Sequence, residues 1–202
     1  KNDIESKNII EKNKINILYD PIISPKNIKN NLIKTENATE DKKYFLAIGR
    51  LTRQKNFIFL IDTFRYYNKK KKEKLIIVGE GEQKKLILDF IQLNNLQETV
   101  IIHNFTKDIF NYYKHAKCFI LSSLWEDPGF VLVEACYMNT PIISSNCKNG
   151  PNEILDYGKN GLLFKSNNKE SLLEAFQKFE MLSTEQLNQF KVRAKKKSRE
   201  FT

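Results

Sequence analysis

From Tyr44 to the end of the chain, short apolar runs alternate with longer amphipathic stretches, and this alternation strongly limits the possible folds. Continuous apolar runs between amphipathic helices predict strands of a parallel sheet that is covered on both faces. The expected fold is therefore a doubly wound parallel sheet of the α/β, Rossmann-like type. We expect strands at residues 44–48, 75–78, 100–102, 118–121 and 141–143. We expect helices at residues 57–67, 82–93, 107–115, 130–138, 169–179 and 184–198.

The domain is expected to occupy residues 41–202. Residues 1–40 are polar and rich in Lys, Asn and Glu, with a short strand expected at residues 15–19, so we interpret them as a connecting segment. The hydrophobic content of 41% over 202 residues supports a packed core. No apolar run approaches the roughly 20 residues of a membrane span, and no secretory leader pattern is visible. We expect a cytoplasmic protein.

The cysteines and histidines do not form a metal-binding or disulfide pattern. Cys118, Cys136 and Cys147 are odd in number and contain no Cys-x-x-Cys pair, which favours a reducing compartment. His103 and His115 make no metal-ligand spacing with them. We therefore expect no bound metal.

The net charge of +10 comes partly from lysine runs at residues 69–72 and 195–197. Both runs fall at the expected C-terminal ends of helices, where the helix dipole favours cations. The favoured interpretation is a solvated helix end. The alternative is attraction to anionic lipid or to a phosphate-bearing substrate.

The sequence around residues 122–135 predicts a ligand site. Glu126 and Glu134 bracket a turn that contains Pro128 and Gly129, directly before an expected helix. Backbone N–H groups in the first turn of a helix have no partner within the helix and can bind an anion. Carboxylates beside such a site can accept hydrogen bonds from hydroxyls. The pattern indicates a ligand that carries both phosphate and sugar.

A second loop, which follows the expected strand at residues 44–48, concentrates positive charge. Gly49 permits a tight exit from the strand, and Arg50, Arg53 and Lys55 follow it. The helix dipole disfavours cations just before a helix, so a bound anion would offset that cost. Arg50 and Lys55 are the candidate phosphate ligands. Arg53 is expected to be a surface residue.

Two further loops follow strands of the same sheet. The Gly-x-Gly at Gly79 lacks the third glycine of a dinucleotide-binding fingerprint, because Lys84 stands there. We expect a tight turn in which Gly79 allows a ligand to approach closely. In the next loop, Asn104 and Phe105 offer an amide and a flat apolar ring for a nucleobase. His103 is interpreted as a loop histidine without a catalytic role.

Taken together, these loops resemble the C-terminal, nucleotide-sugar-binding domain of a retaining glycosyltransferase of the GT-B type, family GT4 (glycosyl transferases group 1). The resemblance runs from about Tyr19 to the end of the chain, and its strongest element is Ser123-x-x-Glu126 through Glu134, similar to the family's Glu-x7-Glu signature. The other matching pieces are Gly49-Arg50-Leu51, Lys55-Asn56, Val78-Gly79-Glu80-Gly81, Thr140-Pro141, Gly150-Pro151-Asn152-Glu153 and Asn160-Gly161.

The resemblance implies a role for each loop. Arg50 and Lys55 would bind the donor's pyrophosphate, Glu134 the ribose hydroxyls, and Glu126 the donor sugar. Arg50, Lys55 and Glu126 would form the catalytic group. The full donor site implied is Gly49, Arg50, Lys55, Gly79, Asn104, Phe105, Glu126, Gly129, Phe130, Val131, Leu132 and Glu134, with backbone amides supplied at positions 130–132.

The implied reaction transfers a hexose or N-acetylhexosamine from a nucleotide sugar, with UDP the favoured carrier, to a glycan or lipid-linked acceptor with retention. The resemblance implies no metal or cofactor, and it suggests a bacterial polysaccharide enzyme in peripheral contact with an anionic membrane. An N-terminal Rossmann-like acceptor domain is expected to be absent, with residues 1–40 as its tail or a linker. We expect the fragment alone to bind donor weakly without turnover.

The sequence departs from the family pattern at two places. Pro128 lies within a turn that commonly reads Glu-Gly-Phe-Gly, and Asn104 stands where a glycine is frequent. Two other classes of protein remain open. One is a non-catalytic basic module for nucleic acid or an anionic membrane, although aromatic residues are not interleaved with the lysine runs. The other is a nicotinamide-dependent oxidoreductase, which the missing third glycine disfavours.

Overall fold

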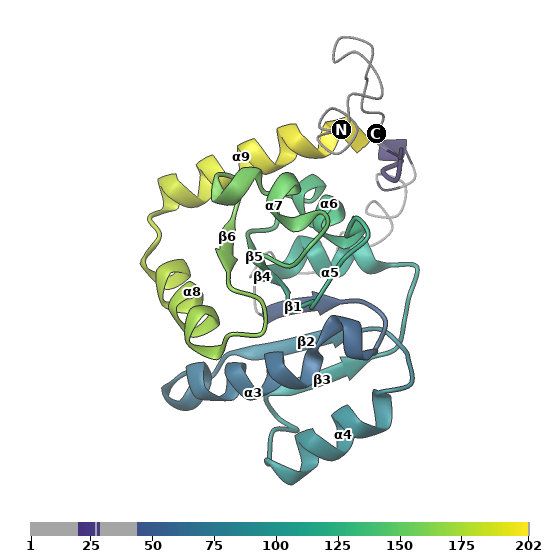
Figure 1. The fold of residues 1–202 in the computed structure, drawn as a ribbon, viewed down its shortest axis with the longest axis vertical. Coiled ribbons are helices and arrows are strands. Elements are labelled where there is room, and N and C mark those ends of the chain that lie inside the picture. The colour runs from purple at the N-terminus through teal and green to yellow at the C-terminus, as the bar shows by residue number, and fades with distance from the viewer. Residues whose placement is uncertain (1–19, 27, 29–43, 202) are drawn as a thin grey trace, which may run out of the picture.

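The computed structural model describes residues 20–26, 28 and 44–201. It contains a six-stranded parallel sheet with the order β3-β2-β1-β4-β5-β6 (Figure 1). This confirms the expected doubly wound α/β class. The expected strand at residues 15–19 lies outside the described residues. The strands are β1 (Tyr44–Ile48), β2 (Lys74–Val78), β3 (Val100–His103), β4 (Ala116–Leu121), β5 (Ile142–Ser145) and β6 (Leu162–Phe164).

The α-helices from residue 44 onward are α3 (Phe57–Tyr67), α4 (Lys84–Leu93), α5 (Ile109–His115), α6 (Phe130–Tyr137), α7 (Pro151–Ile154), α8 (Lys169–Met181) and α9 (Thr184–Ser198). Six of these seven lie where the amphipathic stretches predicted them, whereas α7 was not among the expected helices. Strand β6 was not predicted, because it has three residues and only Phe164 among them is fully buried. Its pairing with β5 is therefore a tertiary contact that no local apolar run indicates.

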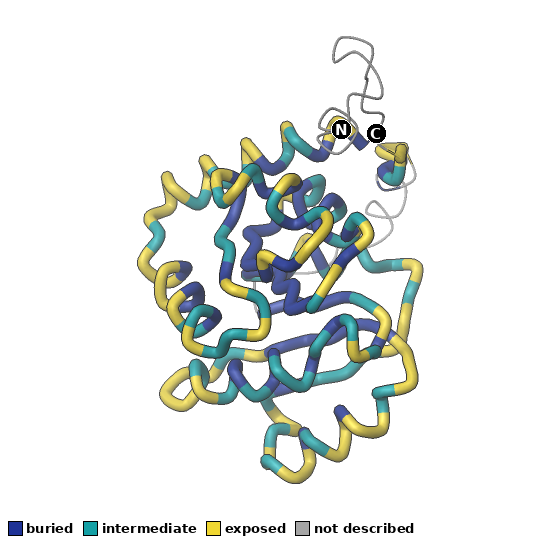
Figure 2. The backbone as a smooth tube through the Cα atoms, in the orientation of Figure 1, coloured by how far each residue is buried: buried dark blue, intermediate teal, exposed yellow. Residues whose placement is uncertain are grey.

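Each central strand sends alternate side chains into two separate cores. In β1, Phe45 and Ala47 enter a core covered by α3, α4 and α8. Leu46 and Ile48 enter a second core covered by α5, α6 and α9. The inner strands β1, β2, β4 and β5 are buried along most of their length, whereas the outer surfaces of α4 and α9 are exposed (Figure 2). Burial on both faces explains why the strands read as continuous apolar runs.

The short described segment before the sheet packs on this domain. Ile23 and Ile28 are buried in the second core, beside α6 and α9. The backbone amides of Ile22 and Ile23 donate to the carbonyl of Phe201, at distances of 3.0 and 3.1 Å. Part of the expected connecting segment therefore contributes to the core of the domain.

The strand order places two loops at the centre of one sheet edge. From β1 the chain builds outward through β2 and β3, then returns to the other side of β1 with β4. The loops after β1 and β4 thus leave neighbouring strands and run to opposite faces of the sheet. Ligands of doubly wound sheets bind in the crevice at such a switch point.

Candidate functional site

A cleft of about 1010 Å³ lies at the carboxyl ends of the strands, around the switch point. It brings together ten of the twelve residues predicted for the donor site, which come from four different loops and from α6. Those ten are Gly49, Arg50, Lys55, Gly79, Phe105, Glu126, Gly129, Phe130, Val131 and Glu134. Asn104 and Leu132 do not line the cleft.

The loop after β1 and the loop after β4 are joined by hydrogen bonds that form one wall of the cleft. The amide of Leu124 donates to the carbonyl of Gln54, and the Gln54 side chain donates to the carbonyl of Trp125, both at 2.8 Å. The Ser122 hydroxyl donates to the carbonyl of Lys55 at 2.7 Å. These bonds place the Lys55 side chain directly above the turn that carries the first glutamate.

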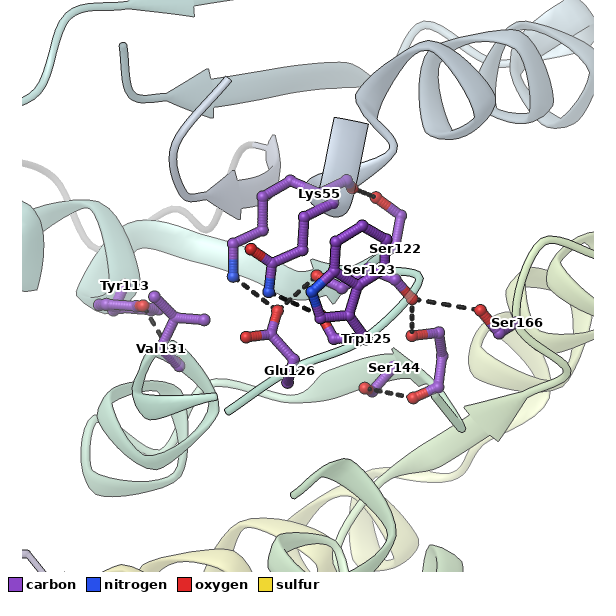
Figure 3. Close-up of polar contacts among 11 residues, drawn as sticks. Lys55, Tyr113, Ser122, Ser123, Trp125, Glu126, Val131, Ser144 and Ser166 are labelled. Carbon is purple, nitrogen blue, oxygen red and sulfur yellow. Dashed lines mark hydrogen bonds and ion pairs between the residues drawn. The ribbon is translucent and has the colours of Figure 1, made fainter. Parts of the chain in front are cut away.

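Lys55 and Glu126, both of which line the cleft, form a buried ion pair between these two loops. The Lys55 ammonium lies 2.6 Å from Oε1 of Glu126, and the Ser123 hydroxyl donates to the same oxygen at 2.5 Å (Figure 3). Gly49 leaves room for the lysine, because a Cβ at that position would lie 3.1 to 3.3 Å from carbons of the Lys55 side chain. The cleft therefore holds its buried cation paired with the acid.

A third loop, which follows β5, packs against the turn that carries Glu126. The Glu126 amide donates to the carbonyl of Lys148 at 3.1 Å. Gly150 has a φ of +111° and sits against the same turn, where a Cβ would lie 1.7 Å from the carbonyl oxygen of Pro128. Asn149 lines the cleft beside it. The Gly150-Pro151 motif thus shapes the Glu126 turn.

Glu134, the second acid of the cleft, is the fifth residue of α6. Burial raises the pKa of its carboxyl to about 7, although the hydrogen bond from the Tyr113 hydroxyl opposes the shift. That hydroxyl is 3.0 Å from Oε2 of Glu134 and 3.1 Å from the carbonyl of Val131. Because Tyr113 is fully buried, it holds the carboxylate at a fixed place on the cleft wall.

The N-terminus of α6 offers two backbone amides instead of the three predicted. Gly129 caps the helix with a φ of +91°. Phe130 and Val131 have no acceptor for their amides among the described residues. The Leu132 amide already donates to the carbonyl of Gly129 at 2.9 Å, and its side chain is buried in the core. The prediction that the Leu132 amide is available to a ligand is therefore wrong, because this amide already has an acceptor within the first turn of α6.

The two arginines of the loop after β1 differ in position, as predicted: Arg50 lines the cleft and Arg53 does not. Arg50 lines the cleft, is exposed, and forms no side-chain hydrogen bond or ion pair with any described residue. Arg53 is exposed and lies outside the cleft lining. Arg50 is thus a cation of the cleft lining that has no partner among the described residues, whereas Lys55 is paired with Glu126.

Two sequence interpretations need correction in the neighbouring loops. Gly79 lines the cleft, but the group that approaches it closely is the backbone of Gly49 and not a ligand. A Cβ at Gly79 would lie 1.9 Å from the carbonyl oxygen of Gly49. Asn104 turns to α4 and accepts a hydrogen bond from Lys84 at 2.6 Å. Phe105 does line the cleft and is exposed.

The cleft also includes residues that the sequence did not single out. Gln54, Trp125 and Asn149 line it because their loops are fixed against the Glu126 turn. Among these three residues, only Trp125 could have been suggested by the sequence, because it directly precedes Glu126. The charged lining comprises the cations Arg50 and Lys55 and the acids Glu80, Glu126, Asp127 and Glu134.

Within the described part of the chain, no group of three or more His, Cys, Asp or Glu side chains is placed to hold a metal ion. The three cysteines are buried and unpaired. No helix among these residues has both the length and the apolar character needed to cross a bilayer.

The chain resembles known proteins in family, in sequence and in fold. Residues 28–197 match the family described as glycosyl transferases group 1. An uncharacterized glycosyltransferase of Methanocaldococcus jannaschii is 36% identical over 165 residues, which cover 75% of this chain and 41% of that protein. The Campylobacter jejuni N-acetylgalactosamine-N,N'-diacetylbacillosaminyl-diphospho-undecaprenol 4-alpha-N-acetylgalactosaminyltransferase is 31% identical over 191 residues, or 89% of this chain and 51% of that one.

The fold resembles solved structures of glycosyltransferases. A crystal structure of a mutant of S. aureus TarM in complex with Fondaparinux, alpha-GlcNAc-glycerol and UDP matches with a TM-score of 0.71 at 22% identity. The match covers 96% of this chain and 42% of that one. The likeness confirms the expected fold, that of one Rossmann-like half of a GT-B architecture. The chain spans about two fifths to one half of these relatives.

Proposed function

The chain belongs to the glycosyl transferases group 1 family, and we propose that it is the donor-binding domain of a retaining, GT4-type enzyme. The reaction proposed is transfer of a hexose or N-acetylhexosamine from a nucleotide sugar to a glycan or lipid-linked acceptor. The observation that carries the proposal is the cleft at the switch point, where Lys55 and Glu126 are paired and Glu134 lines the same cavity.

The geometry supports one orientation of the donor. Glu134 and Phe105 lie on the side of α5 and α6, where a ribose and a base fit: the carboxylate accepts from hydroxyls, and the exposed ring can stack. Arg50, Lys55 and the first residues of α6 line the same cleft as the two acids, and we propose that they neutralise the pyrophosphate there. The sugar is then placed beside Glu126.

The proposed catalysis is electrostatic. As the glycosidic bond to the pyrophosphate breaks, negative charge grows on the departing nucleoside diphosphate, and preorganised cations stabilise that charge. Arg50 is free to meet it, whereas Lys55 is held in place by Glu126 before the donor arrives. Glu126 would contact hydroxyls of the donor sugar and position its reacting face. The proposal assigns no step to a metal or cofactor.

The names of the relatives support the choice of donor and acceptor. The S. aureus structure contains UDP, and the C. jejuni enzyme is named for transfer of N-acetylgalactosamine to a diphospho-undecaprenol-linked acceptor. We therefore propose a UDP-sugar as donor and a bacterial lipid-linked or polysaccharide glycan as acceptor. An acceptor of that kind would place the enzyme in the cytoplasm, peripherally on the inner face of the plasma membrane.

The proposal includes a second domain of the same enzyme. The chain spans 41% of the M. jannaschii relative, so an N-terminal acceptor domain would complete the cleft. We propose that the present chain binds donor and does not turn over by itself.

The rival basic module is not favoured by the cleft. The charged lining of the cleft includes four acids and two cations, whereas a surface that binds a nucleic-acid backbone presents many cations along it. The lysine runs lie at or just after the C-terminal ends of α3 and α9. The run after α3 is exposed, as predicted for a solvated helix end, whereas Lys195 donates to the carbonyl of Tyr137 and Lys197 pairs with Glu200. Contact of these ends with an anionic membrane remains part of the proposal.

Calorimetry with UDP, GDP and ADP tests the proposed donor site. UDP is expected to bind, and the variant Glu134→Ala is expected to weaken UDP binding by roughly tenfold or more through loss of the ribose contact. Absence of binding by all three nucleotides, with the fold intact by circular dichroism, would contradict the proposal. Robust sugar transfer by this chain alone would contradict its second half.

A further inference from the structure

The two oxygens of the Glu126 carboxylate are used unequally. Oε1 accepts from the Lys55 ammonium at 2.6 Å and from the Ser123 hydroxyl at 2.5 Å. Oε2 accepts no hydrogen bond from any described residue, and Figure 3 draws it without a contact. Glu126 lines the cleft although it is 3% exposed. One oxygen is thus saturated by the protein and the other is left for a ligand.

Ser123 is itself held rigidly. It is fully buried, and its carbonyl accepts from the Ser145 hydroxyl at 2.7 Å and from the Ser166 hydroxyl at 3.2 Å. Ser145 is the last residue of β5, and Ser166 follows β6. The backbone of Ser123, whose hydroxyl donates to Glu126, is therefore anchored to β5 and to the segment after β6 (Figure 3).

The lysine alone would not keep Glu126 in place during donor binding. Lys55 is one charge shared between two anions, because the pyrophosphate of the proposed donor would draw its ammonium away from the carboxylate. A hydrogen bond from a neutral, buried hydroxyl has no such competing partner. Ser123 can hold Oε1 whether or not the pyrophosphate is bound.

We infer that Ser123 is a positioning residue for recognition of the donor sugar: it orients Glu126 so that Oε2 faces the sugar hydroxyls. This inference rests on the proposed function. A buried serine with a purely structural role would affect nucleotide and nucleotide sugar alike. A positioning role affects the sugar alone, because Ser123 forms no hydrogen bond, among the described residues, with the groups proposed to hold the nucleotide: Arg50, Lys55, Glu134 and the first amides of α6.

The experiment is isothermal titration calorimetry on the whole chain with UDP, UDP-glucose, UDP-galactose and UDP-N-acetylglucosamine. The quantity measured is the Kd of the tightest-binding UDP-sugar divided by the Kd of UDP. In Ser123→Ala this ratio is expected to rise about tenfold, the effect of losing one charge-assisted hydrogen bond, while the Kd of UDP stays within about twofold.

The matched control is Ser144→Ala. Ser144 is fully buried in the neighbouring strand, and its hydroxyl donates to the carbonyl of Ser145 without touching Glu126. Both Kd values are expected to stay within about twofold of those of the unaltered chain. Should Ser123→Ala fail to fold by circular dichroism, Ser123→Cys replaces it, since a thiol of similar size is a weak donor, and the same rise in the ratio is expected.

The outcomes separate the two proposals. An unchanged ratio in the Ser123 variant, or an equal rise in the Kd of UDP and of UDP-sugar, overturns the positioning role and leaves the proposed donor site standing. If the unaltered chain binds none of the four compounds, the proposed UDP-sugar function fails, and the positioning role fails with it. A selective rise in the ratio supports both.

Discussion

The Lys55 ammonium lies 2.6 Å from a carboxylate oxygen of Glu126, which is 71 residues further along the chain. The pair joins the loops after β1 and β4 at the floor of the cleft, where both side chains are almost fully buried. A buried ion pair contributes little net stability, but removing one partner leaves an uncompensated charge. Substitution of either residue alone is thus expected to destabilise the domain, and simultaneous substitution of both is expected to cost less than the sum of the single effects.

Substitution of Lys55 tests this sensitivity. Lys55→Met is expected to lower the free energy of unfolding by about 3 kcal/mol, measured by urea denaturation, because Glu126 would keep only its bond from Ser123. The double variant Lys55→Met/Glu126→Gln should recover at least about 1 kcal/mol relative to the sum of the single effects. In the exposed pair formed with Asp89, Lys85→Met is the control, with an expected cost below about 0.5 kcal/mol. Equal costs for the two lysine variants would contradict the argument.

Gly150 is predicted to be intolerant of any side chain. In Gly150→Ala the new Cβ would meet the Pro128 carbonyl oxygen at 1.7 Å, so the Glu126 turn must shift and UDP-sugar affinity should fall along with stability. Gly158→Ala is the matched control, because its φ is +96° and a Cβ there meets no atom within 4 Å. The control should lose about 1 kcal/mol from backbone strain alone. Comparable urea midpoints for both variants would show that the contact with Pro128 is unimportant.

Arg50 and Arg53 provide a comparison within one loop. Arg50→Ala is expected to weaken UDP binding by roughly tenfold to a hundredfold through loss of a charge-assisted contact with phosphate. Arg53→Ala removes the same charge outside the cleft and should change the Kd by less than about twofold. Calorimetry at constant ionic strength makes the comparison. Equal effects of the two variants would indicate attraction by net charge instead of a specific site.

The raised pKa of Glu134 predicts that nucleotide binding depends on pH. An ionised carboxylate is a stronger acceptor for ribose hydroxyls than a protonated one, so the affinity for UDP should rise about tenfold between pH 6 and 8, across the pKa of about 7. Glu134→Gln should lack this component and retain the slope due to the phosphate itself. Arg50, Lys55 and Glu126 face the same cleft and are unchanged in the comparison. Identical pH profiles for the two proteins would exclude this role.

The same carboxyl makes stability depend on pH with the opposite sign. Its pKa is about 7 in the folded state against an ordinary 4.5, so the folded state binds the proton more tightly. This contribution is fully present below about pH 4.5 and is lost as the pH rises through 7, with an upper bound of about 3 kcal/mol. Urea unfolding at pH 5 and pH 8 should show the loss in the unaltered chain and not in Glu134→Gln. An equal loss in the variant would assign the effect to other groups.

The fold class was determined by local sequence alone. The pattern of apolar runs and amphipathic stretches placed the first five strands and the helices that cover them, because burial on both faces imposes a continuous run that can be recognised without knowing the partner strand. The candidate residues at strand ends followed from the same reasoning, since carboxyl ends of parallel strands meet at one edge. Arg50, Lys55, Glu126 and Glu134 were found in this way.

Only the tertiary structure decided how these residues are used. The pairing of Lys55 with Glu126 and the contact of Gly150 with Pro128 depend on which loops the strand order brings together. The inward turn of Leu132 depends on how the first turn of α6 closes. These are contacts between segments, or choices of backbone geometry, whose energy comes from packing against the rest of the domain. A local pattern can therefore place the acids and cations at one edge, but the assembled sheet determines which of them are paired and which remain free for a ligand.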